Sequence, residues 1–325
     1  MQDHPALDVR DPSAPAAEAR RVRRIVRRAV WGSLRSALRT RAGLVAVNRL
    51  HRALSLPQKR RFFYLCFDPC YRVEGPWTVS FAGRRLVLPL HGDFEPGWIA
   101  ATAFHGYDTE LHELYETLVR APDPPRVFFD VGAGYGLHSL KLLVHGVRVV
   151  SFEPNPACHP FFLECCRRNG LNPDVRAVAV GDAAGEVQLW VPLGRTWLGT
   201  TTAAVARSWG DAAEIETRTV RQTSLDDVVR TEGLVPDVIK IDTEGSEQAV
   251  LAGARAILAS ARPLIVLESW PRPPERAALF ELLAGSHYRL HALRFAQRPS
   301  PALTLDAFVG SPDANFVARP AVLAA

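Results

Sequence analysis

The 325-residue sequence has little of what marks several common classes of protein. It holds five cysteines, none of which forms a Cys-x-x-Cys pair, so neither a disulfide framework nor a cysteine-rich zinc site is indicated. No apolar run approaches the roughly 18 residues that a membrane-spanning helix needs. The start of the chain does not carry the uninterrupted apolar core of a secretory signal, and we therefore expect a cytoplasmic protein.

Acidic residues are absent from one long stretch. Residues 20–61 hold 14 of the 39 Lys and Arg residues and no Asp or Glu, so the other 25 basic residues stand against all 34 acidic ones. The formal charge of +5 therefore hides an acidic body with a basic arm. Lysine occurs only at Lys59, Lys141 and Lys240, which indicates a general bias toward arginine and weakens an interpretation of the arm as a nucleic-acid tether.

The basic arm has the period of an amphipathic helix. Apolar residues recur at three- and four-residue steps from Val22 to Leu38, with arginines between them. Such a stripe either packs against its own protein, which includes a homodimer, or lies on an anionic membrane surface. Peripheral contact of residues 20–61 with the inner face of the membrane and packing on the protein both stay open as interpretations.

The chain divides into three parts by these patterns. Residues 1–62 form a flexible leader and the basic helical arm, and residues 63–125 form an extension with a hairpin at Trp77–Leu90 and a helix near Thr109–Arg120. Residues 126–325 form the main domain.

Strands and helices alternate through the main domain. We predict strands at Val127–Val131, Val147–Glu153, Val175–Val180, Asp237–Asp242, Leu264–Glu268, Tyr288–Arg294 and Asn315–Ala318. The helices between them are predicted at Gly136–His145, Pro156–Asn169, Ser224–Glu232, Ser246–Ala259 and Pro274–Gly285. This alternation is typical of an α/β fold with a mostly parallel sheet and helices on both faces, in which ligands bind beyond the carboxyl ends of the strands.

A glycine turn follows the first strand of this domain, in "VFFDVGAGYGLHSL". A dinucleotide-binding turn reads G-x-G-x-x-G, but Gly132, Gly134 and Gly136 give G-x-G-x-G with Leu137 in the third glycine position. The acid Asp130 precedes the turn, where a carboxylate repels a pyrophosphate and suits a cationic ligand. S-adenosylmethionine has that character. Glu153, at the end of the second strand, can accept hydrogen bonds from both hydroxyls of a ribose.

Further motifs then follow in a recognisable order. "FDVGAGYG", "SFEPNP", "KIDTEGSEQAVLAGA", "RPLIVLES" and "NFVARP" together resemble the FkbM family of S-adenosylmethionine-dependent methyltransferases, from Val127 to the end of the chain. The resemblance implies a class I methyltransferase fold and, for the family prototype, O-methylation of a natural-product hydroxyl. It also implies a cofactor-binding role for these residues: Asp130, Gly132, Ala133, Gly134 and Gly136 at the glycine turn, Glu153 at the ribose and Asp182 near the adenine.

The chemistry is expected in "IDTEGSE". N-methylating enzymes of this fold usually carry an Asp/Asn-Pro-Pro-aromatic turn at this place, and its absence favours transfer to a hydroxyl. Asp242 and Glu244 are the candidate general bases, and His138 is a third candidate. Each also has a structural interpretation: Asp242 as an anchor for the cofactor's amino group, and His138 as a packing residue.

Metal dependence is not expected. Asp242, Glu244 and Glu247 supply oxygen ligands, but no matching Asp-Asn pair follows the next strand. The acceptor is expected to be a sugar, a polyketide or a lipid-linked saccharide, with the segment before Pro122 and the irregular segment Pro192–Asp211 as its walls. An RNA methyltransferase that uses the arginine-rich arm, or a relative that binds the cofactor without catalysis, remain as alternatives.

Overall fold

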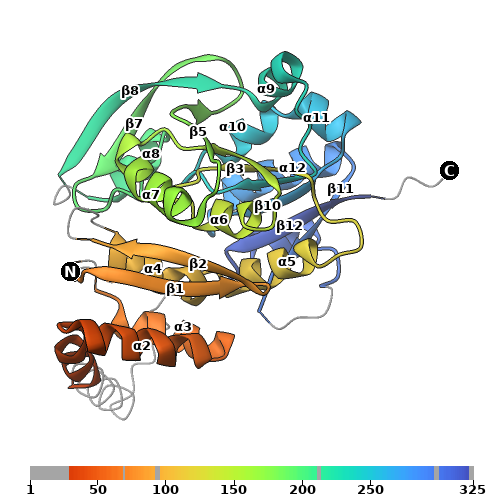
Figure 1. The fold of residues 1–325 in the computed structure, drawn as a ribbon. Coiled ribbons are helices and arrows are strands. Elements are labelled where there is room, and N and C mark those ends of the chain that lie inside the picture. The colour runs from red at the N-terminus through yellow and green to blue at the C-terminus, as the bar shows by residue number, and fades with distance from the viewer. Residues whose placement is uncertain (1–28, 69, 92–95, 211–213, 296–299, 322–325) are drawn as a thin grey trace, which may run out of the picture.

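The computed structural model describes residues 29–68, 70–91, 96–210, 214–295 and 300–321 (Figure 1). The predicted arm helix begins at Val22, so its first turns lie outside the described residues. Within them, residues 29–38 are helical, and α2 (Arg41–Ala53) and α3 (Leu56–Cys66) follow. No helix in the described ranges is both long and apolar enough to cross a bilayer.

A seven-stranded sheet forms the centre of the main domain, in the strand order β11-β12-β10-β9-β3-β4-β5. Its strands are β3 (Val127–Val131), β4 (Arg148–Phe152), β5 (Asp174–Arg176), β9 (Val238–Ile241), β10 (Leu264–Glu268), β11 (Tyr288–Ala292) and β12 (Asn315–Pro320). Neighbouring strands are parallel except around β12, which is antiparallel to both β10 and β11. The predicted mostly parallel α/β sheet is therefore confirmed.

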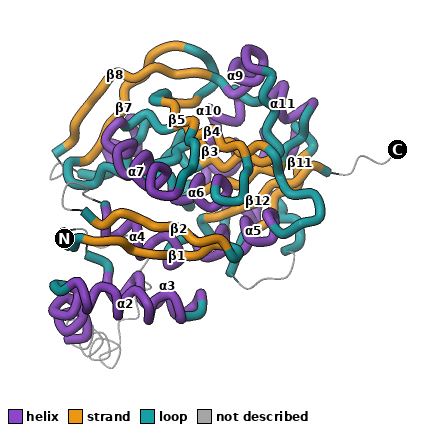
Figure 2. The backbone as a smooth tube through the Cα atoms, in the orientation of Figure 1, coloured by secondary structure: helices purple, strands orange, loops and turns teal. Residues whose placement is uncertain are grey.

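Helices cover both faces of this sheet (Figures 1 and 2). Successive side chains of a strand point to opposite faces, so Phe128 packs with α6 and α7 while Phe129 packs with the helices of the other face. The helices on the Phe128 face are α5 (Thr109–Val119), α6 (Leu137–Leu143) and α7 (His159–Asn169). Those on the Phe129 face are α9 (Leu225–Glu232), α10 (Glu247–Ala252), α11 (Arg255–Ser260) and α12 (Pro273–Gly285).

Two predicted elements of the main domain are each divided in the structure. The strand predicted over Val175–Val180 ends at Arg176, and β6 (Ala179–Val180) joins a separate sheet of order β6-β8-β7. The reason is the long hairpin of β7 (Gly185–Pro192) and β8 (Ile215–Thr223), which the sequence pattern did not reveal and which offers β6 a strand edge.

The helix predicted over Ser246–Ala259 breaks after Ala252. A side chain at Gly253 would lie 2.1 Å from the carbonyl oxygen of Gly181, so the break falls where the chain passes close to a neighbouring segment and only glycine fits. The new helix that starts at Arg255 is capped by Asp226 of α9, whose carboxylate accepts hydrogen bonds from the backbone of Ala256 and Ile257. Charge at a helix N-terminus stabilises the second segment.

Four shorter or peripheral helices complete the described structure. They are α4 (Gly97–Gly106), the 3-10 helix η2 (Pro156–Cys158), α8 (Ala203–Ser208) and α13 (Leu305–Val309). Of these, α4 packs against α3 and the hairpin, and so joins the arm to the extension.

The extension contains the predicted hairpin, formed by β1 (Gly75–Phe81) and β2 (Arg84–Leu90) with its turn at Ala82 and Gly83. In Figure 1 the hairpin lies between α2 and α3 on one side and the main domain on the other. The described part of the arm therefore packs on its own protein, with Leu44 and Val47 buried. Homodimer and membrane contacts stay predictions.

Two asparagines fasten the hairpin at a single rung. Thr78 and Val87 are paired across the two strands. On the outer edge of β1, Asn48 of α2 donates to the carbonyl of Thr78 (2.9 Å) and accepts from its N–H (3.0 Å). On the outer edge of β2, Asn169 at the end of α7 makes the same pair of bonds with Val87, both 2.8 Å long. Each amide thus replaces a neighbouring strand and satisfies backbone groups that the hairpin leaves unpaired.

We predict that Asn169→Ala lowers the free energy of unfolding by roughly 1–3 kcal/mol, because two backbone groups of Val87 lose their partner. The matched control is Asn172→Ala, three residues further along the chain, where the asparagine is exposed and makes no such bonds. Urea unfolding of both variants measures the difference. Equal stabilities of the two variants would show that the rung contributes nothing.

Candidate functional site

The three glycines after β3 have three different reasons to be glycine. All adopt positive φ angles, of 74° at Gly132, 52° at Gly134 and 72° at Gly136. A Cβ at Gly132 would lie 1.7 Å from the carbonyl oxygen of Asp242, and one at Gly136 would lie 2.2 Å from the ring of Phe162. A Cβ at Gly134 would meet no atom within 4 Å. Gly134 is therefore the position at which the turn faces open space.

Most backbone amides of this turn donate hydrogen bonds to other groups of the protein. Gly132 and Ala133 both donate to the carbonyl of Phe152, and Gly136 donates to the carbonyl of Ala133. The Gly134 N–H donates to Glu153. At these four positions the turn does not offer the free amides with which dinucleotide-binding folds hold a pyrophosphate.

Glu153 closes one side of the open space. Its two carboxylate oxygens accept hydrogen bonds from the N–H of Gly134 (2.7 Å) and the N–H of Asn155 (2.8 Å). Burial raises the pKa of Glu153 to about 7, although these two hydrogen bonds favour the charged form. Each oxygen keeps acceptor capacity, so the carboxylate can bind two further hydroxyl groups.

A buried lysine lies directly behind the turn. The Lys240 Nζ lies 3.1 Å from a carboxylate oxygen of Asp242 and 3.4 Å from one of Asp130, and it donates to the carbonyl of Gly132 at 3.1 Å. Burial alone lowers the pKa of Lys240, but the charges of Asp242 and Asp130 outweigh burial and hold the pKa above its ordinary value. The ammonium group thus joins β3, the glycine turn and the end of β9.

The sequence argument about Asp130 needs correction at this point. We expected its carboxylate to face a cationic ligand, but the side chain is fully buried and the cation that it faces is Lys240. Its other oxygen accepts a hydrogen bond from Ser139 (2.6 Å), which also contacts Ser151. Asp130 therefore supports the turn from behind, and the argument against a pyrophosphate rests on the occupied amides instead.

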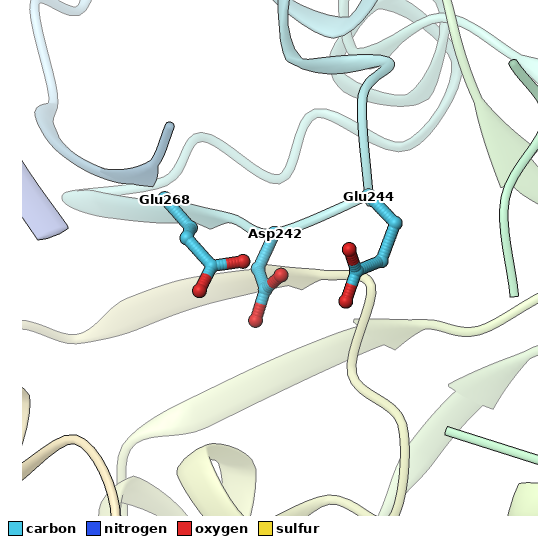
Figure 3. Close-up of side chains that lie close together, drawn as sticks. All are labelled: Asp242, Glu244 and Glu268. Carbon is cyan, nitrogen blue, oxygen red and sulfur yellow. The ribbon is translucent and has the colours of Figure 1, made fainter. Parts of the chain in front are cut away.

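Three carboxylates meet at the carboxyl ends of β9 and β10. Figure 3 shows Asp242 between Glu268 and Glu244, with the three carboxyl groups directed to the same side. One oxygen from each lies within 4.8 Å of the others. Asp242 and Glu244 were predicted, whereas Glu268 was missed, although it is the last residue of β10, the strand next to β9 that lies within the "RPLIVLES" motif. The carboxyl ends of neighbouring parallel strands meet, and this signal was available in the sequence.

The three carboxyl groups differ in their affinity for a proton. Burial raises the pKa of Glu268 well above its ordinary value, and the neighbouring charges of Asp242 and Glu244 raise it further. Burial acts in the same direction on Asp242, but the charge of Lys240 and a hydrogen bond from Glu268 bring its pKa below the ordinary value. Burial and the charge of Asp242 raise the pKa of Glu244 to about 8. At neutral pH Asp242 is therefore the ionised member, whereas Glu268 and most of Glu244 carry a proton.

Glu247 does not belong to this group, contrary to the arrangement considered for a metal. One of its oxygens accepts hydrogen bonds from the N–H of Thr243, the hydroxyl of Thr243 and the N–H of Gly245. It therefore shapes the loop that carries Glu244. Glu268, on the next strand β10, takes its place among the acids. Among the described residues, one oxygen each of Asp242, Glu244 and Glu268 could contact a divalent cation.

His138 and Asp108 extend the site toward the extension. Asp108 precedes α5 in a left-handed conformation (φ 45°), and its carboxylate lies 3.6 Å from the His138 Nε2. Burial and the charge of Asp242 raise the pKa of Asp108 to about 6. Burial lowers the pKa of His138 well below its ordinary value, and Lys240 and Lys141 lower it further, so the ring is neutral. Nothing near Asp108 in the sequence connects it with strands more than a hundred residues away.

The predicted wall segment 192–211 is described as far as Gly210, and hydrogen bonds tie it to two parts of the site. The Asn155 side chain donates to the carbonyl of Thr196 (2.8 Å), which fixes the segment beside Glu153. The Thr200 hydroxyl donates to the carbonyl of Glu244 (2.8 Å), which fixes it beside the acids. Asp182, in contrast, is exposed after β6 with its backbone packed near Gly253. Its predicted place near an adenine stays a prediction.

Comparison with known proteins identifies one domain. The family model of the methyltransferase FkbM domain matches residues 130–292, which hold the glycine turn and the three carboxylates. No match was found among the curated proteins.

Several solved structures resemble parts of the chain. The methyltransferase FkbM from Methylobacillus flagellatus KT is 18% identical, with 70% of this chain and 55% of that one covered and a TM-score of 0.40. The SAM-dependent methyltransferase from Agrobacterium tumefaciens is 12% identical, with 78% and 72% covered and a TM-score of 0.42. The O-methyltransferase from Bacillus cereus is 16% identical, with 60% and 73% covered and a TM-score of 0.32. The chain thus spans about half the length of the Methylobacillus protein.

We predict that Lys240→Met lowers the free energy of unfolding by roughly 3–5 kcal/mol, because two carboxylates lose their buried cation. Lys141→Met is the matched control. Lys141 is equally buried, but burial lowers its pKa to about 8, so removing its charge costs less. Urea unfolding at neutral pH compares the two, and a Lys141 variant that is the less stable one would contradict the central role of Lys240.

Proposed function

Because the chain belongs to the FkbM methyltransferase family and has the class I fold, we propose that it transfers a methyl group from S-adenosylmethionine to a hydroxyl group of its acceptor. One observation supports the proposal most directly. The glycine turn lies directly against the segment that carries Asp242 and Glu244, since Gly132 packs against the backbone carbonyl of Asp242. A cofactor held at the turn and a hydroxyl held by the carboxylates would therefore be neighbours.

The residues of the turn suit S-adenosylmethionine, which when bound supplies a methyl group activated by a sulfonium. Gly134 leaves the room that a ligand needs for close approach, and Glu153 has free acceptor positions for the two ribose hydroxyls. Ala133 and Gly136 hold the turn in shape through their internal hydrogen bonds. The absence of free amides at four turn positions agrees with a ligand that carries no phosphate.

Glu244 is the general base in this proposal. A base works best when its pKa lies near the working pH, and the pKa of Glu244 is about 8. Asp242, ionised and held by Lys240, accepts a hydrogen bond from the same hydroxyl and orients it. The neutral His138 ring lies beside Asp108 and has a pKa too low for an effective base, so it is assigned to positioning.

The site favours a neutral acceptor with several hydroxyl groups. Asp108, Asp242 and Glu244 offer acceptor oxygens that pair with hydroxyl donors, and the ionised Asp108 and Asp242 repel a phosphate backbone. Tyr107 is 38% exposed next to Asp108, and an aromatic ring in that place can stack on a sugar ring. A sugar, a polyketide or a lipid-linked saccharide meets these requirements, whereas RNA does not.

The test of the function is methyl transfer to metabolite and lipid extracts with isotope-labelled S-adenosylmethionine, followed by mass spectrometry of the labelled product. We expect the label as a methyl ether on oxygen. A labelled amine, a labelled base of RNA, or a protein that binds the cofactor without any turnover would each contradict the proposal.

We predict that Glu153→Gln weakens binding of S-adenosylhomocysteine by roughly 1–3 kcal/mol, because the amide replaces an acceptor oxygen with a donor. The wild-type affinity should fall as the pH decreases through about 7, since protonation of Glu153 removes acceptor capacity. Calorimetry over a pH series measures both effects. Glu164→Gln on α7, where the carboxylate pairs with Arg167 and Arg168, is the control and should behave as wild type. An unchanged affinity in Glu153→Gln would remove this residue from the cofactor site.

We predict that kcat rises with pH up to about 8 and is constant above it, because only the ionised form of Glu244 accepts the hydroxyl proton. Glu244→Gln should lower kcat by roughly 10²–10⁴ and abolish the rise with pH. Affinity for S-adenosylhomocysteine should remain within a few-fold, in contrast to Glu153→Gln. A variant that loses rate but keeps the pH profile would assign the base to another residue.

A further inference from the structure

The outer face of α2 exposes apolar side chains that have no partner in the described structure. The inner face buries Leu44, Val47, Asn48 and His51 against the rest of the protein. On the opposite face Val45 and Leu50 are each 58% exposed, the largest exposures among the large apolar residues of the described chain. The small residues Ala42, Ala46 and Ala53 are also exposed. The outer face of α2 therefore presents apolar side chains that the described residues do not cover.

Arginines share this exposed side of the arm, and Arg49 lies one turn after Val45 on the same side of α2. Arg41, Arg49 and Arg52 are exposed on α2 itself, and Arg60 and Arg61 are exposed on α3. The sequence holds no acidic residue from position 20 to position 67. Among the ion pairs of the described residues, Arg35 with Asp68 (3.4 Å) is the one that involves an arginine of the arm. The arginines of α2 and α3 therefore form no ion pair with an acidic side chain of the described residues.

We propose that the outer face of α2 lies on the surface of a bilayer that contains anionic lipid. Val45 and Leu50 enter the boundary between headgroups and acyl chains, while the arginines around them pair with lipid phosphates. Charge favours this occupant over a second copy of the chain packed face to face, because that packing would bring arginines of α2 against each other.

The position of the arm connects this surface with the catalytic site. In Figure 1, α2 and α3 form the outermost layer on the side away from the central sheet. Gly106 of α4 packs closely under α3, since a Cβ there would lie 2.3 Å from that of Phe63. Tyr107 and Asp108 of the site follow directly in the chain. If the proposed function holds, this surface places the site near an acceptor anchored in lipid; membrane binding itself does not depend on that function.

Co-sedimentation of the full-length protein tests the proposal. The probes are vesicles of phosphatidylcholine with phosphatidylglycerol, and vesicles of phosphatidylcholine alone. We expect binding to the first kind, little binding to the second, and weaker binding as salt increases. The double variant Val45→Asp with Leu50→Asp should lose at least about tenfold in affinity. Both residues are exposed, so the fold should persist, which thermal unfolding checks.

Matched variants separate the apolar and the charged contributions. Leu163→Asp is the control, because Leu163 is an exposed leucine (46%) of helix α7 that lies outside the arm. Arg49→Gln with Arg52→Gln should weaken binding to anionic vesicles by about tenfold or more. Equal binding by the wild type and the Val45/Leu50 variant overturns the proposal. The proposal is also overturned if the wild type does not bind vesicles but is a dimer that the Val45/Leu50 variant converts to a monomer. Binding of the wild type to RNA and not to vesicles overturns it as well.

Discussion

The burial of one ammonium group constrains most of the site. Lys240 and Asp130 occupy paired positions on the neighbouring strands β9 and β3, so their side chains project from the same face of the sheet. A charge in this interior cannot be hydrated and must be neutralised by groups that reach it. Asp130 and Asp242 supply the charge, and the carbonyl of Gly132 supplies a hydrogen bond. The glycine turn and the end of β9 are therefore fixed with respect to one another before any ligand arrives.

This arrangement also explains how carboxyl groups so close together divide their charge. Repulsion keeps neighbouring carboxylates from being ionised together, and the nearest cation decides which one keeps the charge. Lys240 lies beside Asp242, so Asp242 remains ionised and Glu268 holds the proton. Burial and the charge of Asp242 raise the pKa of Glu244 to about 8, while the charges of Arg272 and Lys240 oppose that rise. The three groups of Figure 3 thus have separate chemical characters despite similar side chains.

The sequence predicted those features that depend on local patterns. The strand at Val127–Val131, the hairpin turn at Ala82–Gly83 and the grouping of Asp242 with Glu244 all follow from short stretches. Features made by distant segments were missed or misassigned. Asp108 reaches the site through the packing of α5 on α6, and no local sequence pattern predicts that contact.

The role of Asp130 was misjudged for the same reason. Its partner Lys240 lies 110 positions away in the chain, so a sequence argument assigned its charge to a ligand instead. The breaks in the predicted strand at 175–180 and helix at 246–259 likewise come from neighbours distant in sequence, the β7–β8 hairpin and the Gly181 backbone. Periodicity predicts an element, but the space left by other segments decides where it ends.

The asparagine pair at Thr78 and Val87 has a consequence for how the hairpin tolerates change. Backbone groups of a strand alternate in direction from one residue to the next, so a shift of one residue would turn the N–H and C=O away from both amides. Asn48 and Asn169 therefore fix the register of the hairpin from its two opposite edges, and only one alignment of β1 with β2 satisfies both. Inserting or deleting a single residue in either strand would disrupt the hydrogen bonds to both α2 and α7. Changes of length in the hairpin should accordingly be confined to its turn at Ala82 and Gly83, which lies beyond the pair Thr78 and Val87.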